Sequence, residues 1–219
     1  RPVKVSLFER FVLAVAGVWM FFSAPRMVLR YARRARRANQ RFHPALPISC
    51  NDKFAWRKLV DHDPRFVRVS DKLEARNWLD EMGCTIPSPQ VLWVGDDPEA
   101  MPNALLRQNV MIKTNHAYAQ VINARDGVPP TPELNETIRV WLAHDHSKVN
   151  HQWAYREITP KVFLEEDVSA SDEPLFDWKA FTFGGHVERS VRQAQVDGTF
   201  VGQIFEPDES GKVVLSPRR

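Results

Sequence analysis

Lys113 is the residue whose surroundings most directly require a chemical explanation. It lies in the segment 109–114 (NVMIKT), whose apolar run predicts a buried strand. Burying an ammonium group is costly unless an anion meets it. One interpretation is a lysine at a sheet edge, with its stem buried and its amino group in water. The functional interpretation is a ligand for a phosphate or carboxylate group.

Three consecutive acids, Glu165, Glu166 and Asp167, end a second apolar segment, 161–167 (KVFLEED), for which we also predict a strand. A solvated turn at a strand end explains such a cluster. A nucleotide-binding hinge explains it equally well, because one carboxylate and the neighbouring backbone amides match the hydrogen-bonding edge of a base.

Other residue types give weaker signals. His144, His146 and His151 form an H-x-H-x4-H pattern, but they follow a helical pattern and match no zinc spacing, so we expect no metal site. Cys50 and Cys84 form no C-x-x-C motif and are interpreted as reduced thiols of a cytosolic protein. Walker A, G-x-G-x-x-G and G-x-S-x-G motifs are absent, and no catalytic residue is assigned.

The elements that position these residues follow from periodicity and capping signals. Helices are predicted from Asn51 or Asp52 to residue 60, over 71–82 with Ser70 as the N-cap, and over 132–146. Strands are predicted over 90–94, 109–114, 119–124, 161–167, 176–183 and 186–193, the last two joined by a Gly184–Gly185 hairpin turn. Because helices and strands are interleaved but the late strands form a hairpin, the predicted class is α+β.

Charge divides the chain of 219 residues into two parts. Its net charge of +3 combines +9 in residues 1–41, where Glu9 is the one acid, with −6 in residues 42–219. In the first part, the apolar run 11–24 is shorter than the roughly 20 residues of a membrane span and is followed by an arginine cluster. Nucleic-acid binding is not expected, because the basic cluster lacks interleaved aromatic residues and the rest is acidic.

Three interpretations of the leader remain: a monotopic helix, a signal-peptide core, or a buried helix of the globular part. Positive charge after the apolar run counts against a signal peptide. We favour a cytoplasmic protein held peripherally or monotopically at the inner face of an anionic membrane through residues 11–41.

Seven phrases together resemble one protein family. They are, in order, 61–64 (DHDP), 70–72 (SDK), 86–89 (IPSP), 110–116 (VMIKTNH), 153–155 (WAY), 162–167 (VFLEED) and 177–185 (DWKAFTFGG). This set, spread over about residues 50–195, resembles the TupA-like ATP-grasp proteins of teichuronopeptide and other bacterial surface-polysaccharide synthesis. The resemblance implies an ATP-grasp-like α+β fold, with a small nucleotide-facing lobe and the start of a larger lobe after the apolar leader helix.

The resemblance also implies a site for ATP. By position, Lys72 and Lys113 resemble the phosphate-contacting lysines, and Glu165 with the backbone after Glu166 resembles the adenine hinge. Asp177 falls where a ribose-hydroxyl acceptor is expected, with Lys179 beside it. The domains expected on this basis are a leader (1–41), a helical region (42–108) and nucleotide-binding lobes (109–219).

Two departures from the family pattern matter. Residues 117–119 (AYA) stand where a glycine-rich phosphate loop is expected. The family's Mg²⁺ ligands have no matching pattern after Gln193, so we expect either that they lie beyond Arg219 or that the metal site has been lost.

The expected function is therefore ATP-dependent joining of a carboxylate to an amine through an acyl phosphate, with a saccharide or uronic acid as acceptor, in cell-envelope or exopolysaccharide synthesis. One alternative is a glycosyltransferase-like enzyme of the same pathway, for which Asp61-His-Asp63 is the one DxD triplet. The other is a non-catalytic, membrane-tethered ATP-grasp relative.

Overall fold

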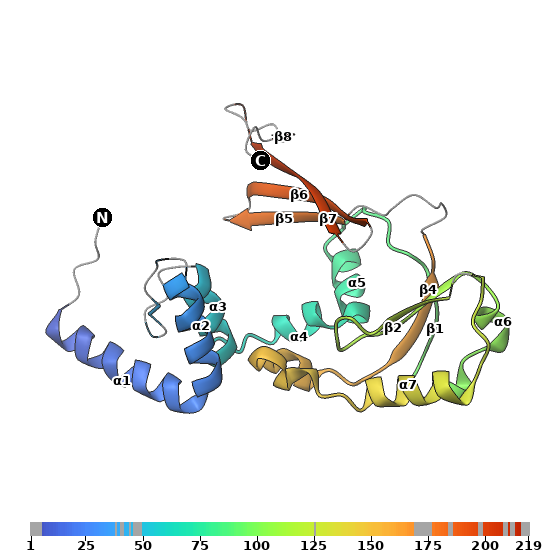
Figure 1. Ribbon diagram of the computed structural model, residues 1–219, viewed down its shortest axis with the longest axis horizontal. Helices are drawn as coiled ribbons and strands as arrows, with labels where there is room; N and C mark the ends of the chain where they lie inside the picture. Colours follow the sequence, from blue (N-terminus) through green and yellow to red (C-terminus); the bar gives the residue numbers. More distant parts are fainter. Residues whose placement is uncertain are drawn as a thin grey trace. The chain divides into compact units, whose positions relative to one another are not determined.

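The computed structural model describes residues 6–37, 39, 42–43, 45, 50–124, 126–168, 177–183, 186–196, 199–207, 210 and 213–215. The chain is mixed α+β with antiparallel sheets, as the sequence predicts (Figure 1). It divides into two compact units, residues 1–166 and 167–219, which are described separately. The division into three parts expected from the sequence stays a prediction.

The first unit holds most of the helices and one four-stranded sheet. Its α-helices are α1 (Leu7–Ser23), α2 (Pro25–Arg37), α3 (Cys50–Leu59), α4 (Arg65–Ser70), α5 (Lys72–Glu81), α6 (Asn103–Leu106) and α7 (Pro132–Leu142). Its 3-10 helices are η1 (Pro98–Ala100), η2 (His146–His151) and η3 (Trp153–Glu157). Its strands are β1 (Val91–Gly95), β2 (Val110–Thr114), β3 (Val121–Ala124) and β4 (Val162–Glu166).

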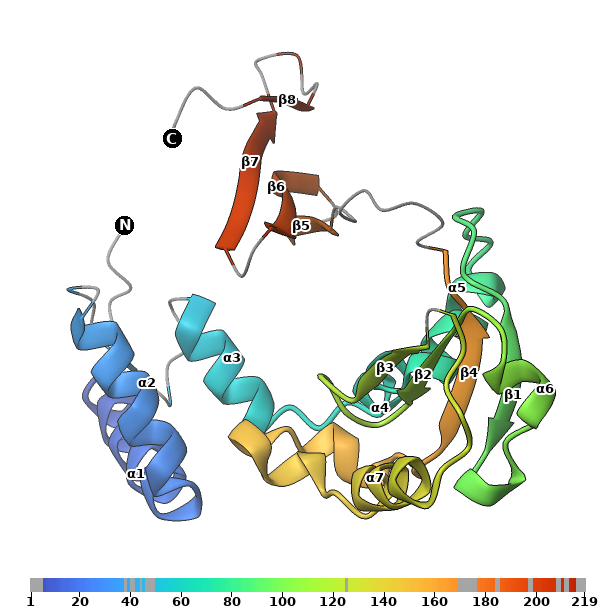
Figure 2. The same cartoon turned by 45° about the vertical axis from the view of Figure 1, so that its right-hand side comes forward.

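The sheet of the first unit has the order β1-β4-β2-β3, with every neighbouring pair antiparallel. Side chains alternate between its two faces. On one face Val110, Ile112 and Leu164 pack against Leu134 and Ile138 of α7 and form the core. Figure 2 shows α7 and α5 on opposite sides of the sheet, so α5 covers the other face.

Two helix boundaries differ from the sequence prediction. Ser70 is the last residue of α4, a helix that the sequence analysis did not predict, and Asp71 is the N-cap of α5. Aspartate takes this role because its carboxylate accepts the N–H groups of Leu73 and Glu74. Helix α7 ends at Leu142 rather than near residue 146, because the chain turns there into η2.

The first two helices share a short core with α3 but leave α1 largely exposed. Met27, Val28 and Tyr31 of α2 pack with Ala24 and with Ala55 of α3. In α1, Met20 is the buried residue. Among the described residues no single helix has the length and apolar character to cross a bilayer. Helices α1 and α2 together have the necessary length and apolar character, but the pair is bent by 114° at its junction.

The second unit is an antiparallel meander of four strands, β5 (Asp177–Phe183), β6 (His186–Val196), β7 (Thr199–Pro207) and β8 (Val213–Leu215). Phe183 pairs with His186, which confirms the predicted hairpin, while Gly184 and Gly185 themselves lie outside the described residues. Strands β7 and β8 were not predicted.

Candidate functional site

A cluster of charged side chains lies on the sheet face that α5 covers. Lys113 pairs across the sheet with Phe163, and Met111 pairs with Glu165, so the side chains of Lys113 and Glu165 lie on the same face. The buried carboxylate of Glu165 accepts hydrogen bonds from the Lys113 ammonium and from the Arg76 guanidinium. Lys113 thus meets an anion, and that anion comes from the protein itself.

The pairing does not remove Lys113 from solvent. Its side chain is 27% exposed and that of Arg76 is 23% exposed, whereas the Glu165 side chain is 2% exposed. Two partly exposed cations therefore share one buried carboxylate. Because their charge exceeds that of Glu165, the face keeps a net positive charge that an incoming anion can neutralise.

Lys72 starts α5 beside this group. Its ammonium donates to the carbonyl oxygen of Thr114, at 2.7 Å, and to that of Ala117. Burial lowers its pKa to about 8; the charge of Lys113 acts in the same direction, and the nearby Asp71 and Glu165 partly oppose it. A lysine with this pKa carries its charge at neutral pH but loses it readily in alkali.

Asn115 fixes the start of α5 to the end of β2. Its amide nitrogen donates to Asp71 at 2.9 Å and to the carbonyl oxygen of Thr159 at 3.1 Å. Its side-chain oxygen accepts from the backbone N–H of Lys161 at 2.8 Å, and its own carbonyl accepts from the N–H of Lys72 at 3.2 Å. The SDK and KTNH phrases of the sequence are therefore parts of one hydrogen-bonded junction, which sets the position of Lys72.

The loop after β2 retains a backbone shape that favours glycine although it contains none. Ala119 has a φ of 58°, in the left-handed region. The loop is closed by hydrogen bonds from the backbone N–H and the hydroxyl of Thr114 to Gln120. Tyr118 is 53% exposed, and its ring lies 4.4 Å from that of His146. Alanine and tyrosine thus occupy the place where the family resemblance leads us to expect glycines.

Two buried histidines lie next to this loop. Burial lowers the pKa of both His116 and His146, so both rings are neutral at physiological pH. Neither nitrogen of His116, nor Nε2 of His146, has a hydrogen bond of normal geometry within the described residues. The sequence analysis assigned no role to His116, and considered His146 only as part of a histidine pattern that matches no zinc spacing.

Of the six residues proposed from the sequence, the structure brings Lys72, Lys113 and Glu165 together. Glu166 follows Glu165 on the strand and faces the opposite side of the sheet; it is exposed, and its backbone N–H donates to the Gln90 carbonyl at 3.0 Å.

The other two proposed residues lie in β5 of the second unit. Lys179 is exposed, and the side chain of Asp177 lies outside the described part.

Arg76 is the cation that the sequence analysis missed. It stands four residues after Lys72 on α5, so the two side chains lie on the same helix face. That spacing was a usable signal, but its meaning depends on the packing of α5 over Glu165.

The structure also shows the surroundings of the DxD triplet and of the acidic and histidine side chains considered as metal ligands. The two carboxylates of the DxD triplet have arginine partners: Asp61 pairs with Arg57 at 3.8 Å, and Asp63 with Arg65 at 2.5 Å. Within the described residues no three His, Cys, Asp or Glu side chains lie close enough together to hold a metal ion, and the Glu165 oxygens already serve two cations.

The site combines three cations, Lys72, Arg76 and Lys113, with the two buried carboxylates of Asp71 and Glu165. The cations remain in excess, which suits the site to binding a phosphate group. Comparison of the chain with protein-family models, with curated proteins and with solved structures returned no match.

Proposed function

We propose that this protein binds ATP at the α5–β2 site and, as ATP-grasp enzymes do, uses it to join a carboxylate to an amine in bacterial cell-envelope or exopolysaccharide synthesis. The observation that carries the proposal is the excess of cations over carboxylate on one sheet face, formed by Lys72, Arg76 and Lys113 around Glu165. Two of these cations are the lysines that the sequence resemblance relates to phosphate. The ATP-grasp fold itself is part of this proposal.

The proposed reaction proceeds in two displacements. A carboxylate oxygen of the donor attacks the γ-phosphorus, ADP leaves, and an acyl phosphate forms. The amine of the acceptor then attacks the carbonyl carbon, loses a proton, and releases inorganic phosphate. Lys72 and Lys113 would bind the phosphate oxygens, and cations fixed in position stabilise charge that develops during such a transfer. Glu165 would hold Lys113 and Arg76 in position.

Membrane association forms part of the same proposal. The large apolar side chains of α1 are exposed, among them Leu7 at 86%, Phe8 at 75% and Phe22 at 77%. The last turns of α2 carry exposed arginines, which attract an anionic lipid surface. A helix lying in the membrane–water interface would bury the apolar side chains of α1 and place the arginines of α2 near lipid headgroups.

Calorimetric titration with ATP and Mg²⁺ tests the nucleotide part. We expect saturable binding by the wild type and at least about tenfold weaker binding by Lys113→Met, which keeps the apolar stem but removes the charge. Lys53→Met, which changes an exposed lysine of α3, is the matched control and should bind as the wild type does. Absence of binding at millimolar ATP, or equal loss in both variants, would overturn the proposal.

A second candidate is an ATP-binding relative without ligase activity, anchored to the membrane. The exposed Tyr118 and the left-handed Ala119 in the loop after β2 favour it, because backbone N–H groups approach phosphate most closely in glycine-rich loops. Phosphate release from ATP in the presence of mixed uronic acids and amines separates the two. Release that requires both substrates indicates the ligase, whereas ATP binding without release indicates the non-catalytic protein.

A further inference from the structure

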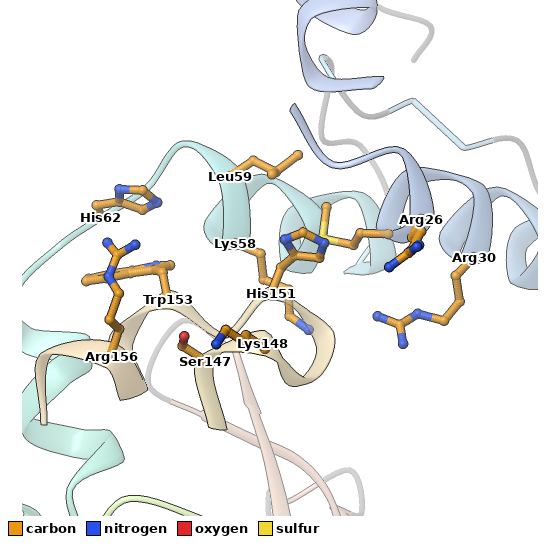
Figure 3. A pocket seen from close by; sticks show the side chains of 11 residues that line it. Arg26, Arg30, Lys58, Leu59, His62, Ser147, Lys148, His151, Trp153 and Arg156 are labelled. Atoms are coloured by element: carbon orange, nitrogen blue, oxygen red, sulfur yellow. The ribbon is translucent and has the colours of Figure 1, made fainter. Parts of the chain in front are cut away.

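A pocket away from the α5–β2 site is lined by side chains of α2, α3, η2 and η3. Its volume is about 670 Å³, within the range of pockets that hold small molecules. Figure 3 shows its labelled side chains, which come from segments more than a hundred residues apart in the sequence. None of Lys72, Arg76, Lys113 and Glu165 lines it, so it is separate from the proposed nucleotide site.

The lining of this basic pocket is strongly positive. It includes five cationic side chains, Arg26, Arg30, Lys58, Lys148 and Arg156, and none of the described residues that line it is acidic. Acids just outside the lining compensate part of this charge. Asp145 pairs with Lys148 and Glu157 with Arg156, each at 3.2 Å.

The cations of the basic pocket repel one another. Burial lowers the pKa of Lys58, and the charges of Arg30 and Arg34 lower it further. Burial also lowers the pKa of His151, again with contributions from Arg30 and Lys58. Bringing like charges together costs free energy, and an anion bound among them would reverse that cost.

An aromatic ring adjoins the charged wall. The indole N–H of Trp153 donates to the Arg57 carbonyl at 3.3 Å, and its ring lies 4.5 Å from that of His62, tilted by 40°. Met27 and Leu59 add apolar surface to the lining. The pocket therefore offers cations for an acidic group together with apolar and aromatic surface for the organic part that carries it.

We propose that the basic pocket binds the phosphate or diphosphate group of an organic phosphate ester, with the esterified group against Trp153. Arginine and lysine side chains from two walls surround the phosphate oxygens, Arg26 and Arg30 from α2 and Lys148 and Arg156 from η2 and η3. Two kinds of ester share this chemistry, a soluble sugar phosphate and the headgroup of a phospholipid or lipid-linked sugar.

The test is calorimetric titration of the whole chain with three probes: inorganic pyrophosphate, a hexose phosphate and a short-chain phosphatidic acid kept monomeric. The double variant Arg26→Gln/Arg30→Gln removes two charges from the pocket. Its matched control, Arg33→Gln/Arg37→Gln, removes two exposed charges from the same helix outside the pocket. We expect the pocket variant to bind pyrophosphate at least about tenfold more weakly and the control to bind it as the wild type does.

Because Arg30 lies in a helix that packs against α3, a second variant is needed to separate loss of binding from loss of folding. Lys148→Gln/Arg156→Gln changes two exposed residues on the opposite wall and should weaken binding similarly, with its thermal unfolding unchanged. Tighter binding of the hexose phosphate than of pyrophosphate identifies a soluble sugar phosphate as the ligand. Tighter binding of phosphatidic acid identifies a lipid headgroup. Failure of all three probes to bind, or equal loss in the control, would overturn the proposal.

ATP binding, measured in parallel, distinguishes this proposal from the proposed function. Because the two sites share no residue, the pocket variants should keep the ATP affinity of the wild type, and Lys113→Met should keep the pyrophosphate affinity of the pocket.

Discussion

Replacing Asn115 with alanine should destabilise the protein severely, because this one side chain joins three parts of the site. The substitution removes hydrogen bonds to Asp71, to the Thr159 carbonyl and to the Lys161 N–H. Asn115 is 1% exposed, so water cannot easily replace these partners. With about 1.5–3 kcal/mol for the bond to the ionised Asp71 and about 0.5–1.5 for each of the two neutral bonds, the expected loss is about 2.5–6 kcal/mol. That is a large share of the ~5–15 kcal/mol by which a domain is usually stable.

Urea denaturation measured by circular dichroism gives this loss as a change in the free energy of unfolding. Asn77→Ala is the control, because the Asn77 amide makes one exposed hydrogen bond, to Glu74 at 3.2 Å, and should cost at most about 0.5 kcal/mol. A cycle with Asp71→Ala then isolates the coupling between Asn115 and Asp71, which we expect at about 1.5–3 kcal/mol.

A loss below about 1 kcal/mol for Asn115→Ala, or one no larger than that of the control, would refute the conclusion that Asn115 fixes the start of α5. A large loss with no coupling to Asp71 would refute the hydrogen-bonded junction in particular. Because the junction sets the position of Lys72, the variant should also weaken ATP binding under conditions where it remains folded.

Two further predictions concern Lys72 and the loop after β2. Since Lys72 loses its proton at about pH 8 in the folded chain but near 10.5 when unfolded, the free energy of unfolding should rise as the pH increases between these values. ATP affinity, in contrast, should fall as the pH increases, because the charge of Lys72 is lost. Urea denaturation and calorimetry at several pH values check both; a Lys72→Met variant showing the same pH dependence would contradict the assignment to Lys72. Ala119→Gly should raise the free energy of unfolding by about 0.5–1 kcal/mol, because glycine adopts the left-handed conformation without strain; a lower melting temperature for this variant would contradict it.

Much of the local structure could be predicted from the sequence, because the spacing of apolar residues reports which side of an element is buried. The strand containing Lys113 begins and ends within a residue of its predicted limits, and so does the strand that ends at Glu166. Strand β7 was missed because Gly202 interrupts its pattern and Pro207 ends it, and both residue types are typical of turns. The start of α5 was misplaced by one residue because Ser70 and Asp71 are both good N-caps, and only their hydrogen bonds distinguish them.

By itself, then, the sequence determined the α+β class, the strands that carry Lys113 and Glu165, and the separation of a basic leader from an acidic remainder. Which charges meet was decided by the tertiary structure. The register between β2 and β4 places Glu165, and not Glu166, on the face of Lys113. Packing likewise joins Asn115 to Asp71 across 44 residues and assembles the basic pocket from distant helices. The physical reason is that periodicity is a property of neighbouring residues, whereas register and packing depend on contacts between segments far apart in the chain.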